Sequence, residues 1–165
     1  MSGSSDKTLK IWKALNGEII NSLNGHSAGI WSVSYSPDGQ FIVSGSSDKT
    51  GKIWGVLDGK LINTLIGHTG GVWSLSYSPD GQYIASGSLD KSVKIWGALD
   101  GKLIITLIGH TESVWSVSYS EDGKYIASGS EDKTVKIWST IDGKLIHTLY
   151  GHKDTVWKVS YSKDG

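Results

Sequence analysis

The sequence GHTESVWSVSYSEDGKYIASGSEDKTVKIWSTIDGKLIHTLY, residues 109–150, decides the fold because the chain contains this unit about four times. Its opening Gly-His pair recurs every 42 residues, and the histidines of these pairs are His26, His68, His110 and His152. Residues 67–108 are identical to residues 109–150 at 30 of 42 positions. A fixed period of this size indicates a propeller or a solenoid, in which each unit buries its apolar faces only against its neighbours.

Within the unit, apolar residues recur with a period close to two, which is typical of strands and not of helices. We expect four short strands, at residues 114–119, 125–130, 134–138 and 144–149. Turn residues separate them: Ser-Glu-Asp-Gly follows the first strand, and Ile-Asp-Gly precedes the fourth. Four antiparallel strands in 42 residues correspond to one propeller blade.

The order of residues also carries a family resemblance. Gly-His, then Val-Trp-Ser-Val-Ser-Tyr-Ser-x-Asp-Gly, then Ala-Ser-Gly-Ser-x-Asp-Lys-x-Val-Lys-Ile-Trp resembles the WD40 repeat, and the match covers essentially the whole chain. The resemblance implies an all-β WD40 β-propeller with four blade equivalents per chain. One departure concerns the Trp-Asp pair that names the family, because Trp12, Trp54, Trp96 and Trp138 are followed by Lys, Gly, Gly and Ser.

Composition excludes several classes of protein. The chain of 165 residues has no Cys, so it forms neither disulfides nor thiolate metal sites. Its 16 basic and 16 acidic residues cancel and form no run, which argues against a nucleic acid or an anionic membrane as partner. No apolar run approaches the length of a membrane span, and the first residues, MSGSSDKT, are polar. We expect a cytoplasmic protein without a cofactor.

The repeats are offset from the ends of the sequence. Three repeats occupy residues 25–66, 67–108 and 109–150, within a single array that covers residues 1–165. Residues 1–24 align with the later strands of the unit, and residues 151–165 align with its first strand. We therefore predict that 1–24 form a partial blade that is completed by 151–165. This join lacks three residues, the counterparts of residues 124–126.

The angle between blades predicts how the ring closes. The WD40 resemblance implies a ring of seven blades, in which each blade is rotated by about 51° from the one before. By simple closure, a ring of four blades needs about 90° per blade and a ring of eight needs about 45°. The angle for eight blades is much nearer to that for seven than the angle for four blades is. We therefore predict an eight-bladed ring of two chains, a homodimer closed by exchanged strands, since unpaired strand edges would favour association in any case.

A combination of His, Ser, Asp and Trp occurs once in every unit. The WD40 resemblance makes it a structural tetrad, with His before the first strand, Ser on the second, Asp in the tight turn and Trp on the third. The four sets are His26, Ser44, Asp48 and Trp54; His68, Ser86, Asp90 and Trp96; His110, Ser128, Asp132 and Trp138; and the split set of His152 with Ser2, Asp6 and Trp12. Such groups satisfy each other's hydrogen bonds when they are buried together.

Chemical alternatives to this structural role fit the pattern less well. A Ser-His-Asp hydrolase needs one exposed and activated nucleophile, whereas this trio recurs in every unit beside a Trp. A zinc site would need several histidines to converge on one ion, but each blade has one such His. The Asp-Gly pairs are ordinary turns without the spaced carboxylates of a calcium loop. His147 stands where other units have Asn21, Asn63 and Ile105, so we interpret it as a surface residue of an outer strand.

The first strand of each unit carries a second Trp. These residues are Trp31, Trp73, Trp115 and Trp157. The WD40 resemblance places them at a bulged position near the rim of the central channel, where partners commonly bind. Their indoles could bind a peptide, stack bases or cage a methylated cation, although the neutral net charge counts against bases. They could instead wedge the blades and fill the centre. Leu89 and Glu131 vary from blade to blade on the same face, so we treat them with the Trp residues as candidate partner contacts.

These observations favour a non-catalytic scaffold that binds a protein or peptide partner through its top face and central opening. The alternative is a recently amplified or engineered repeat whose main property is self-assembly into a closed propeller, with no specific ligand. High identity between units favours that alternative. An enzyme is a distant third, because no unique reactive group is visible.

Overall fold

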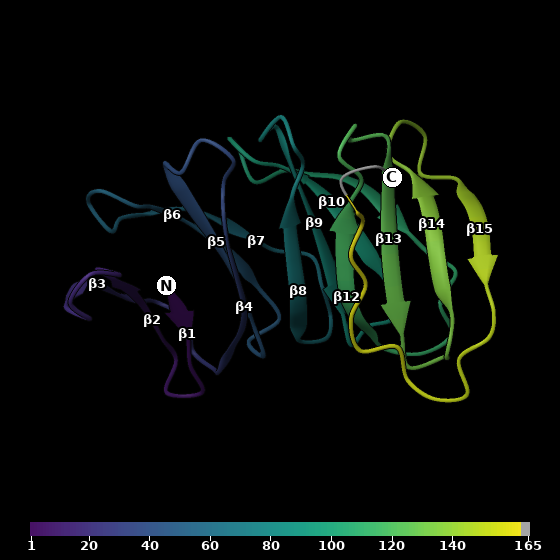
Figure 1. Cartoon of the computed structure of the whole chain (residues 1–165), viewed down its shortest axis with the longest axis horizontal. Helices are drawn as coiled ribbons and strands as arrows, with labels where there is room; N and C mark the ends of the chain where they lie inside the picture. The colour runs from purple at the N-terminus through teal and green to yellow at the C-terminus, as the bar shows by residue number, and fades with distance from the viewer. Residues whose placement is uncertain (163–165) are drawn as a thin grey trace.

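The computed structural model describes residues 1–162. Its described residues contain strands and turns, and the strands form four antiparallel sheets arranged side by side (Figure 1). Each sheet follows directly after the previous one in the sequence, as expected for propeller blades. The all-β prediction is confirmed. No helix long and apolar enough to cross a bilayer occurs in this part of the chain.

The first sheet has three strands, and the other three sheets have four each. The strands of the first two sheets are β1 (Ser2–Gly3), β2 (Thr8–Trp12) and β3 (Ile19–Asn24), followed by β4 (Ile30–Tyr35), β5 (Phe41–Ser46), β6 (Gly51–Gly55) and β7 (Leu61–Leu65). Those of the third and fourth sheets are β8 (Val72–Tyr77), β9 (Tyr83–Ser88), β10 (Val93–Gly97), β11 (Leu103–Leu107), β12 (Val114–Tyr119), β13 (Tyr125–Ser130), β14 (Val135–Ser139) and β15 (Leu145–Leu149). The predicted strands of the third repeat agree with β12 to β15 within one residue.

The turn between the second and third strands of each blade has an unusual backbone. One Lys in each turn has a backbone φ between 69° and 73°, a left-handed conformation that residues other than Gly seldom adopt. These residues are Lys7, Lys49, Lys91 and Lys133. The preceding Asp compensates, because its carboxylate accepts the backbone N–H two residues further on, as Asp48 does from Thr50 at 3.0 Å. The turn thereby fixes the Asp that each tetrad uses.

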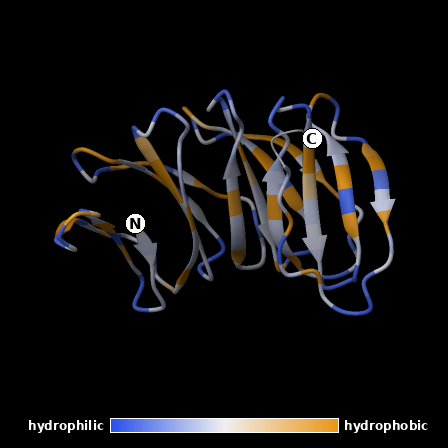
Figure 2. Ribbon diagram, viewed as in Figure 1, coloured by the Kyte–Doolittle hydropathy of each residue, from blue (hydrophilic) through white to orange (hydrophobic). Residues whose placement is uncertain are grey.

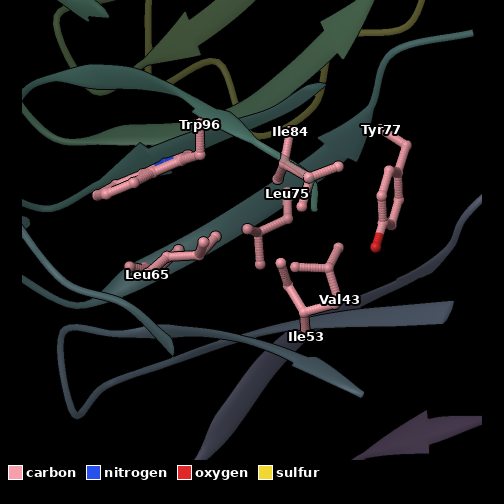
Figure 3. Packing of buried hydrophobic residues seen from close by; sticks show 9 residues of the cluster. Val43, Ile53, Leu65, Leu75, Tyr77, Ile84 and Trp96 are labelled. Atoms are coloured by element: carbon pink, nitrogen blue, oxygen red, sulfur yellow. The ribbon is translucent and has the colours of Figure 1, made fainter. Parts of the chain in front are cut away.

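The hydrophobic core lies between the sheets. Val43, Ile53 and Leu65 of the second sheet pack with residues of the third, among them Leu75 and Trp96 (Figure 3). Apolar residues are concentrated along the strands, while the turns at both ends are largely polar (Figure 2). A single blade therefore has no core of its own, and each needs a neighbour on both faces.

Residues 151–162 contain no assigned strand, yet they lie where the next blade would begin. Val159 N–H donates to Ser116 Oγ at 3.1 Å, as Val117 N–H donates to Ser74 Oγ and Leu75 N–H to Ser32 Oγ at the same distance. The segment thus contacts β12 in the way that each first strand contacts the one before it. No described residue pairs with it as a second strand.

The first sheet shows the opposite deficiency. Its order is β1-β2-β3, so β1 is an edge where the other sheets have a first strand. The first and last sheets lie at opposite ends of the row (Figure 1), and in this structure residues 151–162 do not reach β1. Lys163–Gly165, which the sequence assigns to the turn after this strand, lie outside the described residues.

Candidate functional site: histidine tetrads and a tryptophan row

Three of the four tetrads are assembled within the chain. His Nδ1 lies 2.8, 2.7 and 2.6 Å from the Asp carboxylate in the second, third and fourth sheets. His Nε2 lies 2.8, 2.7 and 2.8 Å from Ser Oγ, which also accepts a hydrogen bond from Trp Nε1 at 2.8 Å in all three. These hydrogen bonds connect the Asp of the turn to the His of the loop, that His to the Ser of the second strand, and that Ser to the Trp of the third strand.

The partners determine the protonation of the His ring. The Asp carboxylate only accepts, so Nδ1–H donates to it, and Nε2 of the neutral ring accepts from the Ser hydroxyl. Burial lowers the pKa of His26 and of His110, although the Asp partner opposes this effect in each case. Burial would raise the pKa of Asp48, but hydrogen bonds from Thr50, Ser27 and His26 outweigh it and lower that pKa to about 2.

The same three residue types form a catalytic triad in hydrolases, but here the Ser is inaccessible. Ser44 and Ser128 have no exposed surface, and Ser86 is only 1% exposed. Each Oγ is buried and already bonds His and Trp, so it is not accessible to a substrate. The groups thus satisfy one another in the interior, where each such bond contributes about 0.5–1.5 kcal/mol to stability.

The fourth tetrad is separated in this structure. Trp12 Nε1 donates to Ser2 Oγ at 2.9 Å, and Asp6 accepts from Thr8, so these two pairs match the other blades. His152 is exposed and bonds none of them. Trp12 is 41% exposed, whereas Trp54, Trp96 and Trp138 are 1–2% exposed. The first sheet therefore lacks the His and the neighbouring strand that would cover its Trp.

The Trp residues of the first strands form a row across the blades. Trp31 and Trp73 are stacked, with ring centroids 4.4 Å apart and planes 15° apart. The ring centroids of Trp73 and Trp115 are 4.8 Å apart, and those of Trp115 and Trp157 are also 4.8 Å apart. Trp31, Trp73 and Trp115 each stand at a register shift of the first strand, which is a β-bulge. We call Trp31, Trp73, Trp115 and Trp157 the Trp row.

The ends of the Trp row are the most open. Trp31 is 48% and Trp157 is 65% exposed, whereas Trp73 and Trp115 are half-buried by their neighbours. The structure therefore shows features of both sequence interpretations, because the rings pack between blades and still leave indole surface at the rim. Trp73 and Trp115 also have buried Nε1–H groups without a partner among the described residues.

The two variable candidates lie beside this row. Leu89 N–H donates to Gly71 O at 3.0 Å, and Glu131 N–H donates to Ser113 O at 2.9 Å, so each is held two residues from a Trp of the row. Leu89 is 38% exposed, and Glu131 is exposed. The rim thus combines an indole surface with side chains that differ from blade to blade.

No group of three or more His, Cys, Asp or Glu side chains that could hold a metal ion occurs within residues 1–162. The tetrad histidines lie one per sheet, and the two ring nitrogens of His26, His68 and His110 are both engaged. The geometry assigns these histidines to hydrogen bonding.

Comparison with known proteins agrees with this geometry. The family model for the WD domain, G-beta repeat (WD40), matches residues 17–55, 59–97, 101–139 and 143–165. The chain belongs to the WD40 repeat family. The four matches cover most of the sequence, and the recognition from repeated motifs is confirmed.

Several curated WD40 proteins share one repeat-sized segment with the chain. Nuclear distribution protein PAC1 of Arthroderma benhamiae is 49% identical over 43 residues, which is 26% of this chain and 9% of that protein. The F-box/WD repeat-containing protein 7 of Drosophila melanogaster is 53% identical over 32 residues, 19% of this chain and 2% of that protein. WD40 repeat-containing protein HOS15 of Arabidopsis thaliana is 42% identical over 41 residues, 25% of this chain and 7% of that protein. The matches thus span less than a tenth of each relative.

Proposed function

We propose that this WD40 chain is a non-catalytic scaffold that binds a peptide segment of a partner protein at the rim around the Trp row. The observation that carries the proposal is the open indole surface of Trp31, which is 48% exposed although its other face stacks on Trp73. Large exposed aromatic groups next to variable side chains are typical of protein interaction sites. The buried and saturated Ser hydroxyls support a role without catalysis.

A peptide array tests this proposal. The chain is labelled and applied to an array of random-sequence peptides, and capture is confirmed by competition with the free peptide. We expect specific capture that Trp31→Ala and Trp115→Ala abolish or weaken about tenfold or more, as for aromatic hot spots. Tyr150→Ala serves as the matched control, because Tyr150 is 83% exposed outside the row. Equal capture by all variants, or no specific capture, would contradict a site at the Trp row.

The open ends of the row of sheets favour a second candidate function, self-assembly. We propose that two copies close one eight-bladed ring, in which residues 151–162 of each copy pair with β1 of the other. Supporting this, the segment is placed as a first strand without a second, while the first sheet has a second strand without a first. In such a ring Trp157 would continue the Trp row toward Trp31 of the partner subunit.

The native mass tests the self-assembly proposal. Light scattering after size exclusion should give twice the chain mass of 17.7 kDa. A mass of one chain would refute the closed dimer and leave the rim proposal untouched, since that site lies on sheets within one chain.

A further inference from the structure

The outer part of the molecule contains a cleft that belongs neither to the tetrads nor to the Trp row. It lies between the third and fourth sheets and has a volume of about 620 Å³. Its lining includes the apolar residues Ile104, Ile105 and Ile141 and the acidic residues Asp80, Glu121 and Asp122. A volume of this size is within the range of sites that bind organic ligands.

The cleft is larger than its counterpart in the preceding pair of sheets. The corresponding cavity between the second and third sheets has a volume of about 170 Å³. There, Asn63 Nδ2 on β7 donates to Leu99 O in the next blade at 2.8 Å, and Asn21 on β3 makes a similar bond to Val56 O. These amides bridge the outer part of each interface. Ile105 on β11 occupies the same repeat position but has no donor, so the bridge is lost and an apolar wall is exposed in its place.

The charged side chains that line the cleft are all acidic. Asp122 forms an ion pair with Lys124 at 3.1 Å, but neither Asp80 nor Glu121 forms an ion pair within residues 1–162. Asp80 uses its Oδ1 atom to accept from Ser78 Oγ and from Gln82 N–H, and its second oxygen accepts no hydrogen bond from the described residues. A cationic group placed here would meet two uncompensated carboxylates.

The floor of the cleft adds an unsatisfied polar group. Tyr119 lines it and is 8% exposed, and its hydroxyl is buried without a hydrogen-bond partner among the described residues. Tyr77 has the same buried hydroxyl beside the smaller cavity, so this feature repeats from blade to blade. A second cavity of about 380 Å³ also touches both tyrosines, but the largest of the three volumes is the cleft beside Ile105.

We propose that this cleft binds a short peptide segment that inserts a bulky aliphatic or aromatic side chain against Ile105 and places a neighbouring Lys or Arg against Asp80 and Glu121. A peptide fits better than a small free amine because part of the apolar lining is open to solvent. Ile104 is 52% and Ile141 is 83% exposed, and a chain that crosses the opening would cover both. The site lies within one chain and does not depend on ring closure.

The test uses the whole chain labelled with ¹⁵N and four probes. They are the capped peptides Ac-Gly-Leu-Arg-Gly-NH2, Ac-Gly-Leu-Glu-Gly-NH2 and Ac-Gly-Gly-Arg-Gly-NH2, and n-hexylamine. Amide signals of Glu121 to Gly123 and of Thr140 to Ile141 should shift on titration with the Leu-Arg peptide, and these five residues should shift least with the Leu-Glu peptide. No shift in the cleft, or equal binding of the peptides, would overturn the proposal. Hexylamine binding as tight as that of the Leu-Arg peptide would overturn the choice of a peptide.

Two variants locate the site. Ile105→Asn should restore the amide bridge and weaken binding of the Leu-Arg peptide at least about tenfold, as expected for loss of a central contact. Its matched control, Ile20→Asn, makes the same change on the outer strand of the first sheet and should bind normally. Glu121→Gln, at an exposed position, should retain the fold and weaken binding about 2- to 5-fold, the range for an exposed ion pair. Unchanged binding in Glu121→Gln would refute the acidic contact even if Ile105→Asn does not fold.

Discussion

Replacing His152 with alanine tests how the ring of blades closes. In the complete tetrads the equivalent His makes two hydrogen bonds, such as those of His68 to Asp90 and Ser86 at 2.7 Å each. At about 1 kcal/mol per bond, the loss is about 2 kcal/mol per tetrad. A two-fold ring would contain two such joins, so His152→Ala should weaken the dimer by about 4 kcal/mol, or about a thousandfold in its dissociation constant.

Sedimentation equilibrium over a range of concentrations measures this effect. His68→Ala provides the contrast, because the partners of His68 belong to the same chain. It should lower the melting temperature, with a smaller effect on the dissociation constant. His147→Ala is the control, since His147 is an exposed residue of β15. Equal effects of His152→Ala and His68→Ala on dimerisation, or a wild-type chain that stays monomeric at all concentrations, would refute the exchanged-strand argument.

Three further predictions concern the tetrads and the Trp row. Ser86→Ala removes the common partner of His68 and Trp96 and should lower the free energy of unfolding by about 2–4 kcal/mol in chemical denaturation, because two buried groups lose their bonds; Ser76→Ala on the same sheet is the control, and equal effects would argue against the tetrad as a stabilising unit. The melting temperature should fall as the pH decreases below about 7, since the pKa values of His26, His110 and Asp48 are all lowered in the folded state, so that the unfolded chain binds more protons in acid; a melting temperature that rises on acidification would contradict this sign. Trp31→Ala should remove the exciton signal of the stacked Trp31–Trp73 pair from the far-ultraviolet circular dichroism, whereas Trp12→Ala should leave it, and an unchanged spectrum of Trp31→Ala would show that the pair is not stacked in solution.

The sequence predicts the local structure well because each repeat states the same pattern several times. Strands β12 and β13 begin and end at the predicted residues, β14 is shifted by one residue at both ends, and β15 begins one residue later than predicted. The tetrad positions also follow from the repeat, since His, Ser, Asp and Trp must occupy equivalent places in equivalent blades. The WD40 resemblance gave their roles, and the distances within three sheets are those of hydrogen bonds.

Contacts between blades could not be predicted in the same way. The 4.4 Å stacking of Trp31 on Trp73 depends on the angle between sheets, which no alternation of residues encodes. The outer cleft depends on one position of the repeat. The sequence shows Asn21, Asn63, Ile105 and His147 there, but the effect of Ile105 appears only when the neighbouring blade is in place to receive, or to lack, a hydrogen bond.

The open ends of the structure allow the apolar and polar contributions to ring closure to be compared. Trp12 is 41% and Trp157 is 65% exposed, whereas the Trp residues equivalent to Trp12 are almost fully buried. If closure buries the exposed 41% of Trp12 and a similar part of Trp157, about 100 Å² per Trp leaves water, which contributes about 2.5 kcal/mol at about 25 cal/mol per Å². Two Trp residues at a join would then contribute about 5 kcal/mol, more than the two bonds of His152. The indoles should therefore provide most of the affinity, and the His should set the register, because its bonds form only when Asp6 and Ser2 are correctly placed. It follows that Trp157→Ala should weaken the dimer more than His152→Ala, and the reverse order would show that the polar join dominates.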